Sequence, residues 1–242
     1  MRIIAGEHRG RKLLPPEGDV TRPITDRVKQ SLFDILAPRI EGARVYDCFA
    51  GTGSMGLECL SRGASHATFF EADRSALARL AKNIDAMRVG KSATVVKGDL
   101  FKWFENHPPS PQRGEGGGEG RNVPSHSTIA SQLTSNTSPL TQPLPSGERG
   151  RSADLIFLDP PYRFLREQPA ALVQLAEHFA SGHLSRDGLV MFRHDIADEL
   201  ALPALNVVDR REYGGMTIEF LQRPAEAGPP VSMGNWQSEI GN

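Results

Sequence analysis

The chain has few cysteines and no long apolar run. Cys48 and Cys59 are the only cysteines among 242 residues, too few for a disulfide framework or a four-cysteine structural zinc site. The seven histidines do not cluster as metal ligands would, so no metal site is expected. No stretch reads as a signal peptide, a lipidation motif or a transmembrane helix, and we therefore expect a cytoplasmic protein without a membrane partner.

An excess of one charge is also lacking. The chain has 28 Lys and Arg against 29 Asp and Glu, a formal net charge of −1. Because phosphate neutralisation dominates the affinity of proteins for nucleic acid, any such contact must come from a local basic patch. The length suits one domain of ordinary size with a proper hydrophobic core, and we expect a monomer.

The most informative segment is Asp159-Pro160-Pro161-Tyr162, which follows the apolar stretch 154–158. Two successive prolines fix φ and remove backbone donors, so the loop is stiff and its carbonyls are left to accept hydrogen bonds. A carboxylate beside such carbonyls can accept from a planar amino group, and the Tyr162 ring offers a face for stacking. The segment therefore favours a site for a nucleobase amine, the alternative being an ordinary strand-ending turn.

A second motif, DCFAGTGSMG at residues 47–56, lies between a short apolar stretch and a helical pattern. Gly51, Gly53 and Gly56 fit the strand-turn-helix glycine fingerprint, in which backbone without a Cβ approaches a ligand closely. Glu71 ends the next apolar stretch, 20 residues after Gly51. That spacing places a carboxylate where it can hold the two hydroxyls of a ribose.

Asp47 discriminates between two classes of cofactor. A dinucleotide site places pyrophosphate at this turn, and a carboxylate four residues before the first glycine would repel it. S-adenosylmethionine has no phosphate and carries an ammonium and a sulfonium group, both of which suit an acid here. Asp99, after the apolar run 93–96, can accept from an adenine amino group. The residues therefore favour S-adenosylmethionine over a nicotinamide dinucleotide.

These two motifs and three N-terminal segments resemble those of the RsmD-type 16S rRNA (guanine-N2)-methyltransferases. The N-terminal segments are MRIIAG at 1–6, RGRKL at 9–13 and RPITDRVK at 22–29. The basic N-terminal string makes the match specific, because DNA adenine-N6 methyltransferases share the Asp-Pro-Pro-Tyr loop. The resemblance implies methyl transfer to the exocyclic amine of one guanine in small-subunit ribosomal RNA, either naked or within an assembling subunit.

The resemblance also implies roles for individual residues. The cofactor-binding residues would be Asp47, Gly51, Gly53, Glu71 and Asp99. The catalytic residues would be Asp159, Pro160 and Tyr162. The RNA-contacting residues would be Arg9, Arg11, Lys12, Arg22, Arg27 and Pro161. The chain departs from the family at Ile24 and at the strand ending Arg193-His194-Asp195, neither of which is expected to touch the other site residues.

The periodicities predict an α/β fold, the Rossmann-like class I methyltransferase architecture with a doubly wound, mostly parallel sheet. A hairpin is expected at 2–14, and after Thr25 or Asp26 a helix with the apolar face Val28, Leu32, Ile35 and Leu36. Strands are expected near 44–49, 67–71, 93–96, 154–158 and 188–193, alternating with helices near 54–62, 74–87 and 168–181. Gly214-Gly215 predicts an antiparallel hairpin, 206–222, that closes the sheet.

We expect a basic N-terminal extension at 1–42, a methyltransferase domain at 43–223 and a flexible tail at 224–242. The domain is interrupted at 107–151, where 25 of 45 residues are Pro, Gly, Ser or Thr. That composition predicts disorder. A tolerated surface insertion is favoured over an RNA-binding arm, because loop closure costs grow slowly with length.

Two other functions share some of these features. A DNA adenine-N6 methyltransferase would use the same acceptor loop, but no DNA-reading domain is evident. A non-catalytic ribosome-assembly factor could bind cofactor and RNA without turnover, but the intact glycine loop and Asp-Pro-Pro-Tyr loop argue against it.

Overall fold

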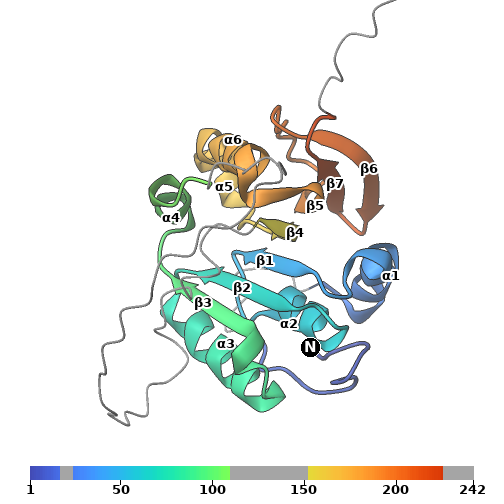
Figure 1. Ribbon diagram of the computed structural model, residues 1–242. Helices are drawn as coiled ribbons and strands as arrows, with labels where there is room; N and C mark the ends of the chain where they lie inside the picture. The colour runs from blue at the N-terminus through green and yellow to red at the C-terminus, as the bar shows by residue number, and fades with distance from the viewer. Residues whose placement is uncertain (17–23, 110–151, 226–242) are drawn as a thin grey trace, which may run out of the picture.

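A computed structural model describes residues 1–16, 24–109 and 152–225. Apolar and β-branched stretches form a seven-stranded sheet in the order β3-β2-β1-β4-β5-β7-β6 (Figure 1). The strands are β1 Arg44–Cys48, β2 His66–Glu71, β3 Ala93–Lys97, β4 Ala153–Leu158, β5 Leu184–Asp195, β6 Asn206–Tyr213 and β7 Met216–Gln222. The five strands expected from periodicity and the closing hairpin are thus confirmed.

The direction of the strands determines where a ligand can bind. Strands β1 to β5 run parallel, whereas β7 is antiparallel to both β5 and β6. From β1 the chain moves outward to β2 and β3, then returns to place β4 on the other side of β1. In sheets of this kind the crevice for ligands lies at that reversal, at the carboxyl ends of β1 and β4.

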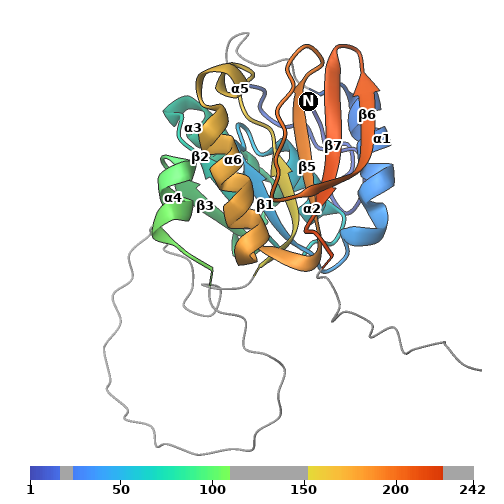
Figure 2. The ribbon, with the colours of Figure 1, turned by 90° about the horizontal axis from the view of Figure 1, so that it is seen from above.

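Helices cover both faces of the sheet. They are α1 Asp26–Leu36, α2 Ser54–Ser61, α3 Arg74–Met87, α4 Leu100–Asn106, α5 Arg163–Glu167 and α6 Pro169–His178, with short turns at η1 Ala37–Arg39, η2 Gly90–Ser92 and η4 Phe179–His183. Helices α1 to α3 pack on one face and α4 to α6 on the other, which Figure 2 shows from above. Helix α5, directly after the Asp-Pro-Pro-Tyr loop, was not expected from the sequence.

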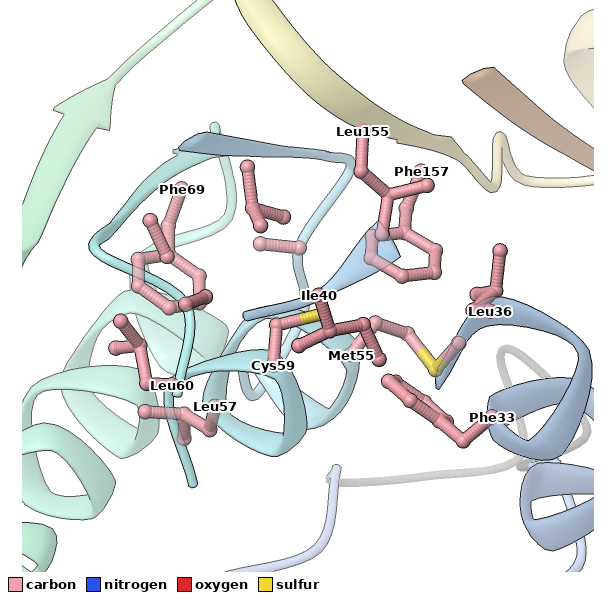
Figure 3. Close-up of a cluster of buried hydrophobic side chains, with 14 of the residues drawn as sticks. Phe33, Leu36, Ile40, Met55, Leu57, Cys59, Leu60, Phe69, Leu155 and Phe157 are labelled. Carbon is pink, nitrogen blue, oxygen red and sulfur yellow. The ribbon is translucent and has the colours of Figure 1, made fainter. Parts of the chain in front are cut away.

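Figure 3 shows part of the core between the sheet and α1 to α3. Phe33 and Leu36 of α1 meet Phe157 of β4, and the rings of Phe33 and Phe157 lie 6.0 Å apart. Ile3 and Leu13, from the N-terminal hairpin, belong to the same cluster. The N-terminal segment therefore shares its hydrophobic core with the sheet.

The buried face of α1 differs from the predicted one. Thr25 caps the helix by accepting from the backbone N of Val28, as expected. Ile35, however, is 37% exposed, and Lys29 takes a buried place on the inner face. The prediction of Ile35 was wrong because a helical period does not reveal that a lysine has a buried acidic partner, here Glu58 of α2.

Glu58 also holds the N-terminal hairpin in place. The hairpin is confirmed by the antiparallel bridge between Arg2 and Lys12. Both oxygens of the fully buried Glu58 carboxylate accept backbone hydrogen bonds from it, from Ile4 at 2.8 Å and Ala5 at 3.0 Å. One carboxylate thus joins α1, α2 and the hairpin.

Parts of two expected segments lie outside the described residues. Only 107–109 of the interruption at 107–151 and 224–225 of the tail at 224–242 are described. Within the described part of the chain, the helices are too short or too polar to span a bilayer.

Candidate active site

The glycine motif forms the turn between β1 and α2. Gly51 adopts φ +57°, and a Cβ added there would meet no atom within 4 Å, so this backbone is open to a ligand. Gly53 is the N-cap of α2. At Gly56, a Cβ would lie 2.4 Å from the Phe69 ring, so this glycine lets α2 pack closely on β2. The three glycines therefore have different tasks, and Gly51 is the one that leaves room for a ligand.

Asp47 lies behind this turn. Its side chain is 2% exposed, and Oδ2 accepts a hydrogen bond of 2.9 Å from the backbone N of Gly56. Burial raises the pKa of Asp47 to about 8, and the charges of Asp159 and Glu71 add to the rise, while the Gly56 hydrogen bond and Lys29 oppose it. A cation bound nearby would favour the ionised form of this carboxyl group.

Glu71, the last residue of β2, holds the glycine turn from the other side. Oε2 accepts from the backbone N of Gly51 at 2.6 Å, and Oε1 accepts from Ala72 and Asp73 at 2.9 and 2.8 Å. Each carboxylate oxygen has two acceptor sites, so these three bonds leave one site, on Oε2, for a hydroxyl donor. Glu71 therefore lies beside the open backbone of Gly51, as its spacing from the glycine motif predicts.

We predict that Glu71→Ala weakens cofactor binding by about 1–3 kcal/mol, because it removes an acceptor and orphans the Gly51 amide. Calorimetry with S-adenosylmethionine measures this loss. Glu105→Ala, which removes an exposed carboxylate of α4, serves as the matched control. Equal affinity of the Glu71 variant and the control would contradict the role of Glu71.

Asp99 lies at the same edge of the sheet, after β3. It is the N-cap of α4, and Oδ1 accepts from the backbone N atoms of Phe101 and Lys102 at 2.9 and 3.4 Å. The carboxylate is exposed, so its remaining acceptor sites face outward. An adenine amino group at this edge could reach it.

The Asp-Pro-Pro-Tyr loop leaves the carboxyl end of β4. Pro160 is buried, while Asp159, Pro161 and Tyr162 are partly exposed. The carbonyl of Pro161 accepts from the backbone N of Phe164 at 2.8 Å, which leads the chain into α5. The loop is thus anchored on both sides, with the carboxylate of Asp159 near the glycine turn, as its effect on Asp47 shows.

Arg193 of β5 contacts Asp159 directly. Its Nε donates to Oδ1 of Asp159 at 2.6 Å, and the two side chains are 5% and 19% exposed. The expectation that the Arg193-His194-Asp195 ending would not touch the other site residues was therefore wrong. Leu158 pairs with Phe192 in the parallel β4–β5 ladder, so the next residues along each strand are neighbours.

Three phenylalanines that sequence reasoning missed join the loops. The rings of Phe49 and Phe164 lie 5.5 Å apart edge to face, and Phe101 lies within 6.0 Å of the first and 6.3 Å of the second. Phe49 has φ +61°, which is uncommon outside glycine and concentrates at functional sites. Each ring follows a predicted site residue within two positions, a signal that could have found them.

The predicted basic residues separate into two groups. Arg9 and Arg27, with Arg2, line a surface hollow of about 380 Å³ between the hairpin and α1. Arg11 instead donates to the carbonyl of Ala86 in α3, and Lys12 is exposed outside the hollow. Arg22 lies outside the described residues.

Together these residues suit a cationic ligand beside a nucleobase amine. The carboxylates of Asp159 and Glu71 both act on Asp47, and the three residues lie at the carboxyl ends of β4, β2 and β1. An anionic pyrophosphate would be repelled there, whereas a sulfonium and an ammonium group would be attracted. Within the described residues, no group of His, Cys, Asp and Glu is arranged to hold a metal ion.

Comparison with known proteins gives consistent results. A family model described as "Conserved hypothetical protein 95" matches residues 1–113 and 122–222. "Putative rRNA methyltransferase YlbH" of Bacillus subtilis is 30% identical over 218 residues, 90% of this chain and 95% of that protein. "Ribosomal RNA small subunit methyltransferase D" of Escherichia coli is 48% identical over 95 residues, 39% of this chain and 48% of its own length. The solved structure "Putative methyltransferase yhhF" from Escherichia coli matches with TM-score 0.65 and 29% identity, covering 92% of this chain and 97% of that one.

Proposed function

Because the chain belongs to the RsmD-type methyltransferase family, we propose that it methylates the exocyclic N2 amine of a guanine in small-subunit (16S) ribosomal RNA. The cofactor is S-adenosylmethionine, the methyl donor of this enzyme class. One observation carries the proposal. The glycine turn follows β1 and the Asp-Pro-Pro-Tyr loop follows β4, and because these strands are parallel neighbours, both loops lie at the same edge of the sheet, where Glu71 contacts the glycine turn.

Five residues of the chain would hold the cofactor. Gly51 leaves space beside its backbone, Glu71 offers an acceptor for a ribose hydroxyl, and Asp99 offers one for the adenine amino group. Asp47 would act indirectly. Its hydrogen bond from Gly56 would hold the first turn of α2, which begins after the N-cap Gly53, in place. When bound, the cofactor supplies an electrophilic methyl group, which needs a lone pair in line with its bond to sulfur.

The acceptor amine is a weak nucleophile, because its lone pair is delocalised into the guanine ring. Hydrogen bonds from the amine to Asp159 and to the Pro160 carbonyl would favour a pyramidal nitrogen and stabilise the positive charge that develops on it. Burial raises the pKa of Asp159, and Arg193 opposes that rise. Most of the rate would then come from positioning, with the proton leaving the nitrogen after or during transfer.

The base must leave its stack to reach this pocket. Tyr162, partly exposed beside Asp159, would stack on the extruded guanine, with Pro161 lining the same loop. The cluster of Phe49, Phe101 and Phe164 would form the apolar wall between the glycine turn and the acceptor loop. An apolar wall excludes water and strengthens the hydrogen bonds to the amine.

RNA would bind over the N-terminal hairpin and α1, within the proposed extension 1–42. Arg9 and Arg27 face one hollow, where a phosphate could contact both. Asp26 reduces the positive charge of this hollow, because it forms an ion pair of 2.8 Å with Arg2. Lys12 and Arg22 would add phosphate contacts, whereas Arg11 is engaged with α3.

We predict that Arg9→Glu combined with Arg27→Glu lowers RNA affinity and reduces the slope of log K against log salt by about 1–2, since about two phosphate contacts are lost. Fluorescence anisotropy with a small-subunit RNA fragment at several salt concentrations measures both effects. The matched control replaces Arg39 and Lys91 by Glu; both are exposed, lie before β1 and β3, and do not line the hollow. Equal salt slopes for the two double variants would show that the hollow is only solvated surface.

Methyl transfer from labelled S-adenosylmethionine to small subunits that lack the modification tests the function. Nucleoside analysis should place the label in N2-methylguanosine. Label in N6-methyladenine of added DNA would identify a DNA methyltransferase instead. Cofactor binding without any label would support a non-catalytic assembly factor. Parallel reactions with naked RNA identify which form is the substrate.

A further inference from the structure

Arg193 contacts Asp159 at the centre of the proposed site. It comes from β5, the strand next to the one that ends in the acceptor loop. Its side chain is 5% exposed, and the Nε–Oδ1 distance to Asp159 is 2.6 Å. The guanidinium group also lies close enough to Tyr162 for the phenol to act on it electrostatically. Arg193 therefore contacts one proposed catalytic residue and lies near a second.

Arg193 influences the ionisation of Asp159. Burial alone would favour the neutral carboxyl form of Asp159, and the guanidinium group opposes this. An arginine stays protonated throughout the range in which enzymes work, so its influence does not change with pH. Removal of the guanidinium group would leave a buried carboxyl group with no opposing positive charge.

The geometry of the contact also limits how Asp159 can turn. A short, charge-assisted hydrogen bond through Nε fixes one carboxylate oxygen. The plane of the carboxylate is then set by a buried side chain that is itself attached to the sheet. The second oxygen, Oδ2, is thereby presented to whatever occupies the space beside Asp159.

We propose that Arg193 is a positioning residue for methyl transfer: its guanidinium group places a positive charge beside Asp159 and fixes the orientation of the carboxylate through Oδ1, so that Oδ2 accepts a hydrogen from the substrate amine. The inference rests on the proposed function of the site. Arg193 does not touch the reacting atoms and acts through Asp159. The rival interpretation is a buried ion pair that only ties β5 to β4.

The pH dependence of turnover separates these interpretations. The ionisable groups around Asp159 are Asp47 from β1, Arg193 from β5 and Tyr162 from its own loop. Asp47 belongs to the cofactor side, so cofactor affinity measured against pH reports its titration separately. Turnover at saturating cofactor and RNA then reports the ionisation of Asp159. A residue that only ties two strands together would lower stability without moving that titration.

The experiment compares Arg193→Met and Arg193→Lys with the wild-type protein in the methyl-transfer assay between pH 5 and about 9. Arg193→Met should lower kcat about 100-fold at neutral pH, the usual cost of a misplaced group. In the profile of kcat against pH, it should also shift the acidic limb to higher pH by about one pH unit or more. KM for RNA and cofactor affinity should stay within about threefold of wild type. Arg193→Lys keeps the charge without the planar donor, so its acid limb should stay in place while kcat falls about tenfold.

Thermal unfolding checks that each variant is folded. A folded Arg193→Met variant with an unmoved acid limb, or with wild-type kcat, would overturn the inference. If that variant does not fold, Arg193→Lys decides: wild-type kcat would overturn the inference and a lowered kcat at unchanged KM would support it. Failure of the proposed function is distinguishable, because the wild-type protein itself would then place no label in N2-methylguanosine.

Discussion

Asp159→Ala is expected to lower the rate of methyl transfer by about 10²–10³-fold or more while cofactor affinity stays within a few-fold. The carboxylate would accept from the amine as positive charge develops there, so its loss acts on the transition state rather than on cofactor binding. The cofactor contacts proposed for Gly51 and Glu71 do not pass through Asp159. Single-turnover kinetics with undermethylated small subunits, together with calorimetry, measure the two quantities separately.

The control for this variant is Asp85→Ala, which removes an exposed carboxylate of α3. It should leave both rate and affinity unchanged. Turnover by Asp159→Ala close to that of the control would eliminate the acceptor role of the carboxylate. A large loss of cofactor affinity would instead place Asp159 on the cofactor side of the site.

Glu58→Ala is expected to destabilise the protein by about 3–5 kcal/mol, the usual cost of breaking a buried ion pair. Its carboxylate binds Lys29 Nζ at 2.9 Å and Arg62 Nε at 2.8 Å, besides two backbone N atoms of the hairpin. Burial raises the pKa of Glu58, but Lys29 and these hydrogen bonds outweigh it and hold the pKa below its usual value. The variant would leave a buried lysine without its acidic partner. Urea unfolding measures the loss.

The exposed ion pair between Arg2 and Asp26 provides the comparison. It has the same kind of contact, 2.8 Å long, but both side chains face solvent. Asp26→Ala should therefore cost less than about 1 kcal/mol. A similar cost for Glu58→Ala would mean that the buried network contributes little and that other contacts hold the hairpin. Because Glu58 anchors the hairpin, its loss should also weaken RNA binding.

The sequence predicted the sheet and the placement of the two proposed site loops at one edge of it, because each depends on local pattern. Alternating strands and helices determine a parallel sheet, and parallel strands bring their carboxyl ends to one edge. The glycine turn, Glu71 and Asp159 could therefore be placed together before any contact was known. The hairpin at 206–222 followed from Gly214-Gly215 in the same way.

The contacts that depend on distant pairing could not be predicted. Lys29 is buried because Glu58 faces it across α1 and α2, and no periodicity within α1 shows a partner 29 residues away. Arg193 meets Asp159 because β4 and β5 pair in a register that only the folded sheet defines. The pKa of Asp47, about 8, likewise depends on burial and on the carboxylates of Asp159, after β4, and Glu71, at the end of β2.

The most direct test is nucleoside analysis of 16S rRNA from a bacterium whose own RsmD-type gene has been deleted and which expresses this chain. Mass spectrometry should show that N2-methylguanosine, lost from small-subunit RNA on deletion, returns with the wild-type chain and does not return with Asp159→Ala at equal expression. Return of the modified nucleoside with both chains, or with neither, would contradict methyl transfer at the site formed by the glycine turn and the Asp-Pro-Pro-Tyr loop.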